Sequence, residues 1–213
     1  MQYSDLKRAL DIIYAIVLGI VFGPACLVTA IAIKLETPNG PVFADIPNRV
    51  GKDGRLFKLY KFRSMIPDAH VLLKSDPKFR ELYDEYKKSS FKLYDDPRVT
   101  RVGKFIRKFS IDEVPQIFNI FRGEMSLIGP RPYFADELED QQKKYPQTKE
   151  LVKKALSVRP GITGQWQVSG RSAINFDKRI DMDAHYAENM NLWYDLKILL
   201  KTPFVMLSGK GAV

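Results

Sequence analysis

Two adjacent carboxylates, Asp112 and Glu113, stand between Arg107 and Arg131 in the stretch RKFSIDEVPQIFNIFRGEMSLIGPRP at 107–132. A carboxylate that faces cations suits covalent attack on phosphorus, because the cations offset the charge on the phosphoryl oxygens. A neighbouring carboxylate could hold Mg²⁺, which takes one or two carboxylates together with phosphate oxygens of a substrate. The pair therefore indicates phosphoryl transfer, with Asp112 as nucleophile and Glu113 as metal ligand. The alternative is an ordinary helix start with acidic residues in its first turn.

The same stretch predicts a short apolar helix beginning near these carboxylates. Apolar residues recur at helical spacing over 117–121, and Gly123 is typical of the position just past a C-terminus. Two starts stay open. A cap at Ser110 forms a capping box but leaves Pro115 at the fifth helical position, whereas a cap at Asp112 puts Pro115 in the first turn. In both cases Asp112 lies beside unpaired N–H groups at the positive end of a helix.

A membrane element is indicated near the start of the chain. Residues 12–33 form a run of 22 without a charge, about 33 Å long as a helix and enough to cross a bilayer. Its length and the lack of a small-residue cleavage site argue against a signal peptide. Basic residues flank both ends, and Gly23-Pro24 permits a sharp kink. A simple spanning helix and a helix that breaks and returns to the same face both stay open.

The basic residues are concentrated after this run. The chain carries 34 Lys and Arg against 25 Asp and Glu, a net charge of +9. Residues 46–110 hold seventeen Lys or Arg and eight Asp or Glu, so the whole excess lies there. Such a region suits nucleic acid, phospholipid headgroups or a phosphorylated substrate. The adjacent apolar run favours the last two.

Other elements are predicted from their periodicity. Cations recur every third residue from Arg98 to Lys108 opposite apolar side chains, which indicates an amphipathic basic helix at an interface or a solvated helix face. The apolar C-terminal run LWYDLKILLKTPFVML at 192–207 is too interrupted to span and suits an interface, the core or an oligomer contact. Short strands are expected at 41–45, 55–65 and 166–168, and polar helices over 68–94 and 133–158.

Several blocks along the chain resemble the bacterial sugar-transferase family, the monotopic phosphoglycosyl transferases that load a sugar phosphate onto polyprenyl phosphate. These blocks follow one another over nearly the full length, after the hydrophobic N-terminus with Pro24. They are GPVF at 40–43, YKFRSM at 60–65, DPRVTRVGKFIRKFSIDEVPQ at 96–116, RGEMSLIGPRP at 122–132, RPGITGQWQVSGRS at 159–172 and YDLKILLKT at 194–202.

The resemblance implies site residues. Asp112 would form a covalent phosphosugar intermediate with loss of UMP, and Glu113 would help to hold Mg²⁺. Arg107 and Arg131 match the family's phosphate-binding cations. Further matches give Lys61 and Arg63 as phosphate-binding residues, Arg171 as a nucleotide contact and Asp183 as a further carboxylate near the metal.

The resemblance also implies an architecture. An α+β fold is expected: a mostly helical compact catalytic domain with a few short strands, at 38–213, and a kinked re-entrant membrane helix at 1–37. The break lies at Gly23 and Pro24, where the family often has Ser before the proline. Interfacial amphipathic helices would hold the domain on the cytosolic face of the bacterial inner (cytoplasmic) membrane.

The implied reaction takes a sugar 1-phosphate from a UDP-sugar to undecaprenyl phosphate in the membrane lipid, with Mg²⁺ as cofactor and no nucleic acid. It is the first membrane step of surface polysaccharide or glycoconjugate synthesis. The long segment 69–95 resembles the hexose branch, which favours UDP-galactose or UDP-glucose. A homodimer is left open.

Two rival functions remain. The Asp181-Met-Asp183 triplet resembles the Asp-x-Asp metal motif of nucleotide-sugar glycosyltransferases, which would release UDP rather than UMP. A non-catalytic basic adaptor built from 46–110 would not depend on Asp112. There is no Walker A motif, dinucleotide fingerprint or zinc-ligand cluster in the sequence, so those chemistries have no support.

Overall fold

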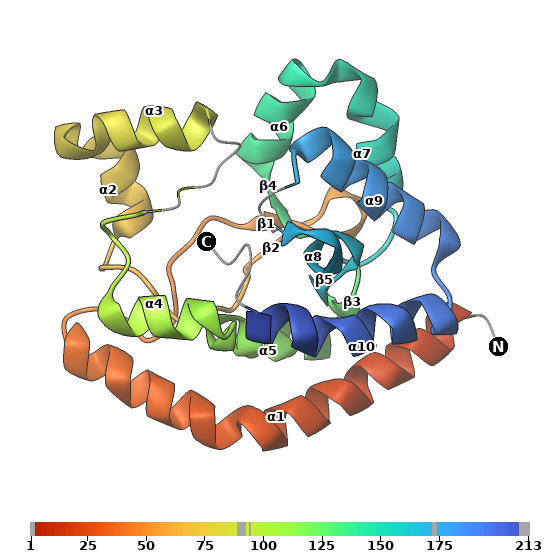
Figure 1. Ribbon diagram of the computed structural model, residues 1–213, viewed down its shortest axis with the longest axis horizontal. Helices are drawn as coiled ribbons and strands as arrows, with labels where there is room; N and C mark the ends of the chain where they lie inside the picture. Colours follow the sequence, from red (N-terminus) through yellow and green to blue (C-terminus); the bar gives the residue numbers. More distant parts are fainter. Residues whose placement is uncertain (1–2, 89–92, 94, 172–173, 209–213) are drawn as a thin grey trace.

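The computed structural model describes residues 3–88, 93, 95–171 and 174–208, and most of them are helical (Figure 1). The helices are α1 Tyr3–Glu36, α2 Ala69–Ser75, α3 Arg80–Lys88, α4 Arg101–Lys108, α5 Ile117–Phe121, α6 Ala135–Lys144, α7 Lys149–Ala155, α8 Gln165–Ser169, α9 Phe176–Asn189 and α10 Leu192–Ser208. The 3₁₀ turns are η1 Lys52–Gly54, η2 Pro77–Phe79, η3 Ile111–Gln116 and η4 Pro146–Thr148. The strands are β1 Arg49–Val50, β2 Leu56–Phe57, β3 Ser126–Ile128, β4 Tyr133–Phe134 and β5 Gly161–Thr163. The predicted mostly helical fold with a few short strands is confirmed.

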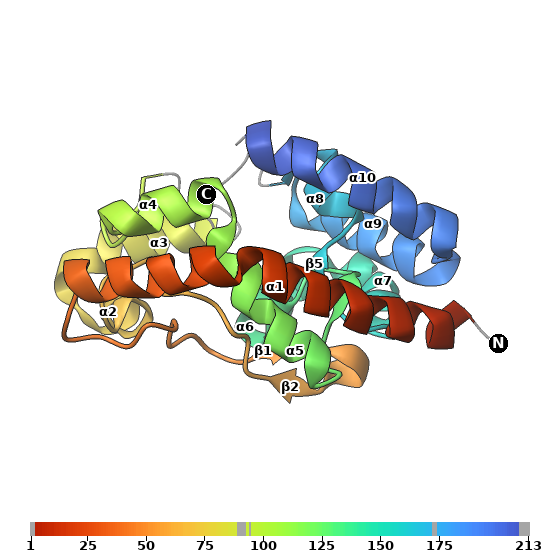
Figure 2. The ribbon, with the colours of Figure 1, turned by 90° about the horizontal axis from the view of Figure 1, so that it is seen from below.

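Helix α1 is the longest element, with 34 residues, and it runs along one side of the remaining chain (Figures 1 and 2). It is the one helix among the described residues that is long and apolar enough to cross a membrane. Pro24 lies inside it without ending it, and the ribbon bends along its length. A proline has no backbone N–H, so one helical hydrogen bond is lost and the helix can bend there. The expected break at Gly23 and Pro24 therefore takes the form of a bend within one continuous helix.

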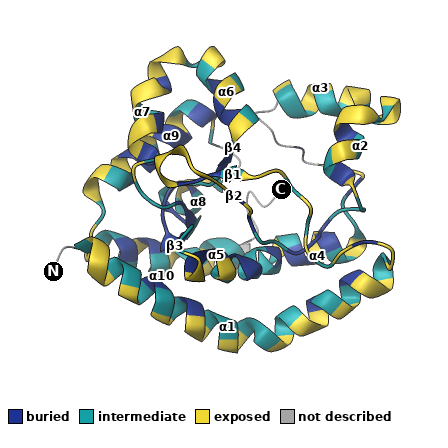
Figure 3. Ribbon diagram, turned by 180° about the vertical axis from the view of Figure 1, so that it is seen from behind, coloured by how far each residue is buried: buried dark blue, intermediate teal, exposed yellow. Residues whose placement is uncertain are grey.

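Both ends of α1 are bonded to the body of the protein. Near its start, the buried Asp11 carboxylate accepts hydrogen bonds from the Ser126 hydroxyl (2.7 Å) and from the Leu127 N–H (2.9 Å). At its end, the Glu36 carboxylate accepts from the backbone N–H groups of the first two residues of α4, at 2.8 and 3.0 Å. Between these anchors, large apolar side chains such as Ile20 and Leu27 are exposed (Figure 3). Whether residues 1–37 form a membrane domain apart from 38–213 stays a prediction.

The strands form two small sheets. Strands β2, β1 and β4 pair antiparallel in that order, while β3 and β5 pair in parallel, with Ser126 opposite Gly161 and Ile128 opposite Thr163. The predicted strand at 166–168 is wrong, because those residues lie in α8 and the preceding β5 supplies the pairing. The predicted strand at 55–65 is reduced to β2 and isolated bridges. An alternating pattern of side chains indicates extended backbone. Such a segment becomes a strand only where a neighbouring strand offers backbone hydrogen bonds.

The main apolar core joins these layers. It contains Ala15 of α1, Ile120 of α5, Leu127 of β3, Tyr186 of α9 and Ile198 of α10. A segment from each end of the chain therefore packs on the central parallel pair of strands, and α1 shares a core with the rest of the protein.

The predicted basic helix is shorter at its start than expected. Helix α4 begins at Arg101, where the Thr100 hydroxyl accepts a hydrogen bond from the Gly103 N–H at 2.9 Å. Arg98 lies outside the helix and is buried against Asp96, with Nη2 to Oδ2 at 2.6 Å and Nε to Oδ1 at 2.8 Å. Because charge spacing alone does not distinguish a solvated cation from a buried pair, the assignment of Arg98 to the basic helix face is wrong.

Replacing Arg98 by alanine should lower the free energy of unfolding by roughly 3–5 kcal/mol, because it leaves the Asp96 carboxylate buried without its partner. Denaturant unfolding in detergent measures this. The matched control is Arg101→Ala, whose exposed side chain is expected to contribute less than about 0.5 kcal/mol. Equal effects of the two substitutions would contradict the structural role of the pair.

Candidate active site

The two adjacent carboxylates lie in η3, directly after α4. Ser110 has a left-handed backbone (φ 54°), which ends α4 and starts the new turn. Its side chain makes no capping hydrogen bond; instead its carbonyl accepts from the Glu113 N–H at 3.2 Å. Neither predicted helix start is right, because the apolar helix α5 begins only at Ile117. Pro115 is accommodated inside the separate 3₁₀ turn.

Asp112 is buried, with 2% of its surface exposed, and it contacts Lys61. The Lys61 ammonium lies 2.7 Å from Asp112 Oδ2 and 3.7 Å from Glu113 Oε1. A buried carboxylate needs such a partner, because taking an isolated charge out of water is costly. Lys61 and Asp112, which were both predicted as site residues, are thus in direct contact. Lys61 also contacts Glu113.

The backbone around Lys61 is fixed on both sides. The Phe62 N–H donates to the backbone carbonyl of Asp112 itself, at 2.9 Å. The Tyr60 N–H donates to the side-chain oxygen of Asn119, also at 2.9 Å, and the Asn119 amide donates to the Lys58 carbonyl at 2.7 Å. Asn119 is completely buried. These bonds hold the segment that carries Lys61 against the turn that carries Asp112.

Sequence reasoning missed Asn119. The available signal was a lone amide within the apolar run IFNIF of α5, since a polar side chain at a core position must find partners. Its amide also donates to the Glu124 carboxylate at 2.7 Å, but its partners at Lys58 and Tyr60 lie about sixty residues earlier in the chain, so no local pattern identifies them.

Arg107 is held at the end of α4. Its Nε donates to the Ser64 hydroxyl at 2.9 Å, and burial lowers the pKa of its guanidinium while the nearby Asp112 opposes that shift. An arginine stays protonated even so. Helix α4 approaches the Ser64 segment closely because residue 103 is glycine: a Cβ there would lie 1.9 Å from the Ser64 carbonyl oxygen. This close packing sets where Arg107 lies.

Arg131 and Asp183 are brought together, but through the backbone. Asp183 Oδ2 accepts from the Arg131 N–H (3.1 Å) and from the Tyr133 hydroxyl (2.8 Å). Burial raises the pKa of Asp183 to about 7, against the opposing effect of these hydrogen bonds. The Arg131 guanidinium lies 5.1 Å from the centre of the Trp166 ring. Asp183 thus holds the Gly-Pro-Arg-Pro segment in place through hydrogen bonds from the Arg131 backbone and the Tyr133 hydroxyl.

Arg171 and Arg63 differ in their surroundings. Arg171 has a left-handed backbone (φ 52°), and its Nη2 donates to the Ser110 hydroxyl at 3.2 Å, which places it beside the turn of the two acids. Arg63 is buried and donates to the carbonyls of Pro41 (2.5 Å) and Thr37 (2.9 Å). Those bonds fix the turn after α1, so its predicted binding of phosphate stays a prediction. Gly23 and Pro24 lie within α1.

One cavity of about 1040 Å³ collects most of these groups. Its charged lining includes Lys61, Arg107, Asp112, Glu113, Arg131 and Arg171. A space of this size is large enough for a nucleotide sugar, since ligand sites measure roughly 300–1,000 Å³. Asp183 does not line the cavity, which separates it from the other predicted site residues.

Glu113 is the group that best fits a magnesium ion. Its side chain is 39% exposed and lines the cavity beside Asp112. Among the described residues, no group of three or more His, Cys, Asp and Glu side chains could hold a metal by itself. Mg²⁺ needs only one or two carboxylates when a substrate supplies phosphate oxygens. Glu113 is therefore compatible with a metal that arrives with a diphosphate.

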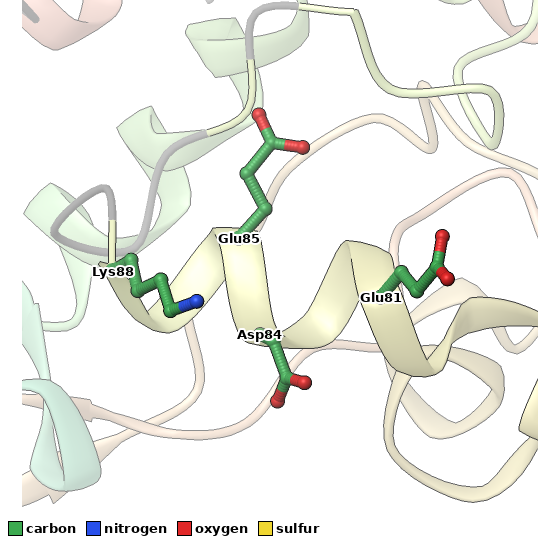
Figure 4. A pocket seen from close by; sticks show the side chains of 4 residues that line it. All are labelled: Glu81, Asp84, Glu85 and Lys88. Carbon is green, nitrogen blue, oxygen red and sulfur yellow. The ribbon is translucent and has the colours of Figure 1, made fainter.

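A second hollow lies along α3 and is lined by Glu81, Asp84, Glu85 and Lys88. Figure 4 shows the three carboxylates pointing away from one another. They do not converge on a common point, so we assign no chemistry to this surface.

Comparison with known proteins gives a consistent result. Residues 2–209 match the family described as bacterial sugar transferase. The chain is 44% identical to the undecaprenyl-phosphate galactose phosphotransferase of Salmonella typhimurium, over 97% of this chain and 41% of that protein. It is 44% identical to the galactosyl transferase CpsE of Streptococcus agalactiae, over 99% and 44% of the two chains. It is 42% identical to the exopolysaccharide production protein ExoY of Sinorhizobium fredii, over 95% and 86%. The chain thus spans less than half the length of the first two.

Replacing Asn119 by alanine should lower turnover, because the segment that carries Lys61 loses both of its side-chain hydrogen bonds. Each lost bond contributes about 1 kcal/mol, so the two together predict a decrease of up to roughly 30-fold. The measurement is a double-mutant cycle with Lys61→Met. If Asn119 acts through Lys61, Asn119→Ala should have little further effect on turnover in the Lys61→Met background. Fully additive effects would show that Asn119 acts elsewhere.

Proposed function

The chain belongs to the bacterial sugar transferase family, and we propose that it transfers a sugar 1-phosphate from a UDP-sugar to undecaprenyl phosphate. The observation that supports this best is the buried Asp112 carboxylate, paired with Lys61 in a cavity that Arg107 and Arg131 also line. A nucleophilic carboxylate surrounded by cations is what attack on a diphosphate requires.

The proposed reaction has two steps. A carboxylate oxygen of Asp112 attacks the phosphorus that carries the sugar; a new oxygen–phosphorus bond forms, the bond to the second phosphate breaks, and UMP leaves. The phosphate oxygen of undecaprenyl phosphate then attacks the same phosphorus and releases Asp112. The product is undecaprenyl diphosphate sugar, and Asp112 is the nucleophile of the first step and the leaving group of the second.

The cations have separate roles in this scheme. Lys61 lies against Asp112 before substrate arrives, and its flexible stem lets the ammonium shift to a phosphoryl oxygen as the carboxylate attacks. Arg107, held by Ser64, stays in place and offsets charge on the phosphate oxygens. Arg171, next to Ser110, is in position to contact the nucleotide.

Glu113 is the residue proposed to hold Mg²⁺. When bound with the diphosphate, the ion would neutralise charge that develops on the leaving UMP. Asp183 as an additional ligand stays a prediction, because its described contacts are with Tyr133 and the Arg131 backbone.

We favour a galactose- or glucose-type hexose as the sugar. Two of the relatives compared above carry galactose in their names and are 44% identical to this chain. The third relative is named an exopolysaccharide production protein, and we propose that the product of this chain is likewise used in exopolysaccharide synthesis. A homodimer stays a prediction.

The location proposed is the cytosolic face of the bacterial inner membrane, with α1 entering and leaving by that face. Asp11 near one end of α1 and Glu36 at the other both bond to the same body. A body on one side of the bilayer therefore keeps both ends on that side, while the exposed apolar side chains between them contact lipid. The exposed cations of α4, such as Arg101 and Lys104, then face anionic headgroups.

The rival glycosyltransferase that uses Asp181 and Asp183 lacks geometric support. Both residues lie in α9, where side chains two positions apart point to different faces. Asp181 is exposed, while Asp183 is fully buried. The two carboxylates therefore do not face one ion.

Replacing Asp112 by asparagine should decrease UMP release by at least about 10³-fold, because the amide is not a competent nucleophile. Purified protein in lipid is incubated with UDP-galactose, UDP-glucose and undecaprenyl phosphate, and UMP is measured. Mass spectrometry of the unsubstituted protein, given the donor alone, should find a hexose-phosphate adduct on Asp112. An adduct on another residue, or an Asp112→Asn protein with normal turnover, would contradict the mechanism.

Asp181→Ala and Asp183→Ala separate the proposal from its rival. Asp181→Ala should retain normal turnover, whereas Asp183→Ala should lose roughly 5- to 100-fold, since two buried hydrogen bonds that hold the Arg131 segment disappear. The nucleotide product is identified by chromatography in each case. Release of UDP, together with a requirement for both aspartates, would support the glycosyltransferase instead.

A further inference from the structure

The cavity that contains Asp112 also has a long apolar part, which the donor chemistry does not use. Its walls are one stripe of α1 and one stripe of α10, each with side chains three or four residues apart. The stripes include Val17, Leu18 and Phe22 from α1, and Leu199, Pro203 and Met206 from α10. A UDP-sugar is polar along its whole length, so these walls are unsuited to it. We call this part of the cavity the α1–α10 groove.

Hydrogen bonds join the two helices near their first turns. The Asp195 carboxylate accepts hydrogen bonds from the Tyr3 hydroxyl (2.5 Å), the Lys7 ammonium (2.7 Å) and the Tyr186 hydroxyl (2.6 Å). From there α1 and α10 run in the same direction and separate, in both views (Figures 1 and 2). Side chains of both helices line the same cavity beyond this junction.

The groove reaches the surface on the side that carries exposed apolar residues. Val17 of α1 lines the cavity although the residue is half exposed, and Phe105 of α4 lines the same cavity and is 59% exposed. Pro203 is likewise exposed and lines the cavity. An apolar mouth of this kind suits entry from lipid rather than from water.

The same cavity also has a strongly charged part. Lys61, Arg107 and Arg131 line the same cavity around Asp112. The cavity is therefore cationic at the nucleophile and apolar away from it. A ligand with one phosphate on a long hydrocarbon chain has the same distribution, with its phosphate directed at the site of attack.

We propose that the α1–α10 groove binds the first isoprene units of the polyprenyl phosphate acceptor and directs its phosphate to the phosphosugar on Asp112. This inference rests on the proposed function and adds the acceptor's binding path to it. Affinity for the acceptor comes from apolar burial between the two helices. The donor occupies only the charged end of the cavity, so the two half-reactions depend on different walls.

Bulky substitutions in the groove test this. Val17→Trp and Leu199→Trp should raise the KM for undecaprenyl phosphate roughly tenfold, equivalent to the loss of about 1.4 kcal/mol of binding. The effect should remain with geranyl phosphate, because its two isoprene units are the part of the acceptor that the groove is proposed to bind. The burst of UMP from donor alone, with no acceptor present, should persist in both variants and demonstrates that they are folded.

Neighbouring residues provide matched controls. Ile16 and Leu200 are exposed apolar side chains next in sequence to Val17 and Leu199, and they do not line the cavity. Ile16→Trp and Leu200→Trp should leave the acceptor KM unchanged. A rise in KM with the controls as large as with the groove variants would overturn the proposal.

Two further results would contradict the groove proposal or the proposed function. If the groove variants lose binding to acceptor-free phospholipid vesicles while the acceptor KM is unchanged, the groove holds bulk lipid and the proposal is wrong. If the unsubstituted protein releases no UMP with any UDP-sugar, the proposed function itself fails, and the acceptor path fails with it. The donor-only burst distinguishes these two results.

Discussion

The burial of the Asp112 carboxylate is the constraint on which the arrangement of this protein depends. A carboxylate with 2% of its surface exposed requires a partner, and Lys61 supplies it at 2.7 Å. That contact needs the Lys61 segment to lie against the η3 turn. Asn119 and the bond from the Phe62 N–H to the Asp112 carbonyl hold it there. The reactive pair is thus maintained by one backbone hydrogen bond and by the Asn119 side chain, both between segments fifty or more residues apart in the sequence, rather than by the turn alone.

The apolar helix α1 takes part in the same framework. Glu36 at its end binds the N-terminus of α4, and Arg107 lies in the last turn of α4. Ala15 of α1 is completely buried in the main core, and Asp11 holds β3. The helix is therefore a structural part of the site and not only an attachment. A substitution at the α1–α4 junction would therefore shift α4 and change the position of Arg107.

The sequence predicted what depends on local pattern. The charge-free run produced α1, and the spacing of apolar residues produced α5, although both its proposed starts were wrong because the left-handed Ser110 inserts a separate turn. The resemblance named Lys61 and Arg171, which the structure brings to the turn of the two acids. Asn119 and the Arg98–Asp96 pair could not be predicted in the same way. The role of Asn119 depends on distant partners and that of the Arg98–Asp96 pair on burial, and neither periodicity nor charge spacing encodes these.

The anchoring of α1 at both ends also bears on how such a protein is made. Because the residues around Asp11 and Glu36 are bonded to one body, the proposed topology requires folding and insertion to be completed from a single side of the bilayer. No hydrophilic stretch between these two anchors has to be translocated, since the run that enters lipid carries no charge. In that topology, the catalytic body folds first and the helix then inserts into one leaflet. Asp11 and Glu36 bond to the body as the helix inserts.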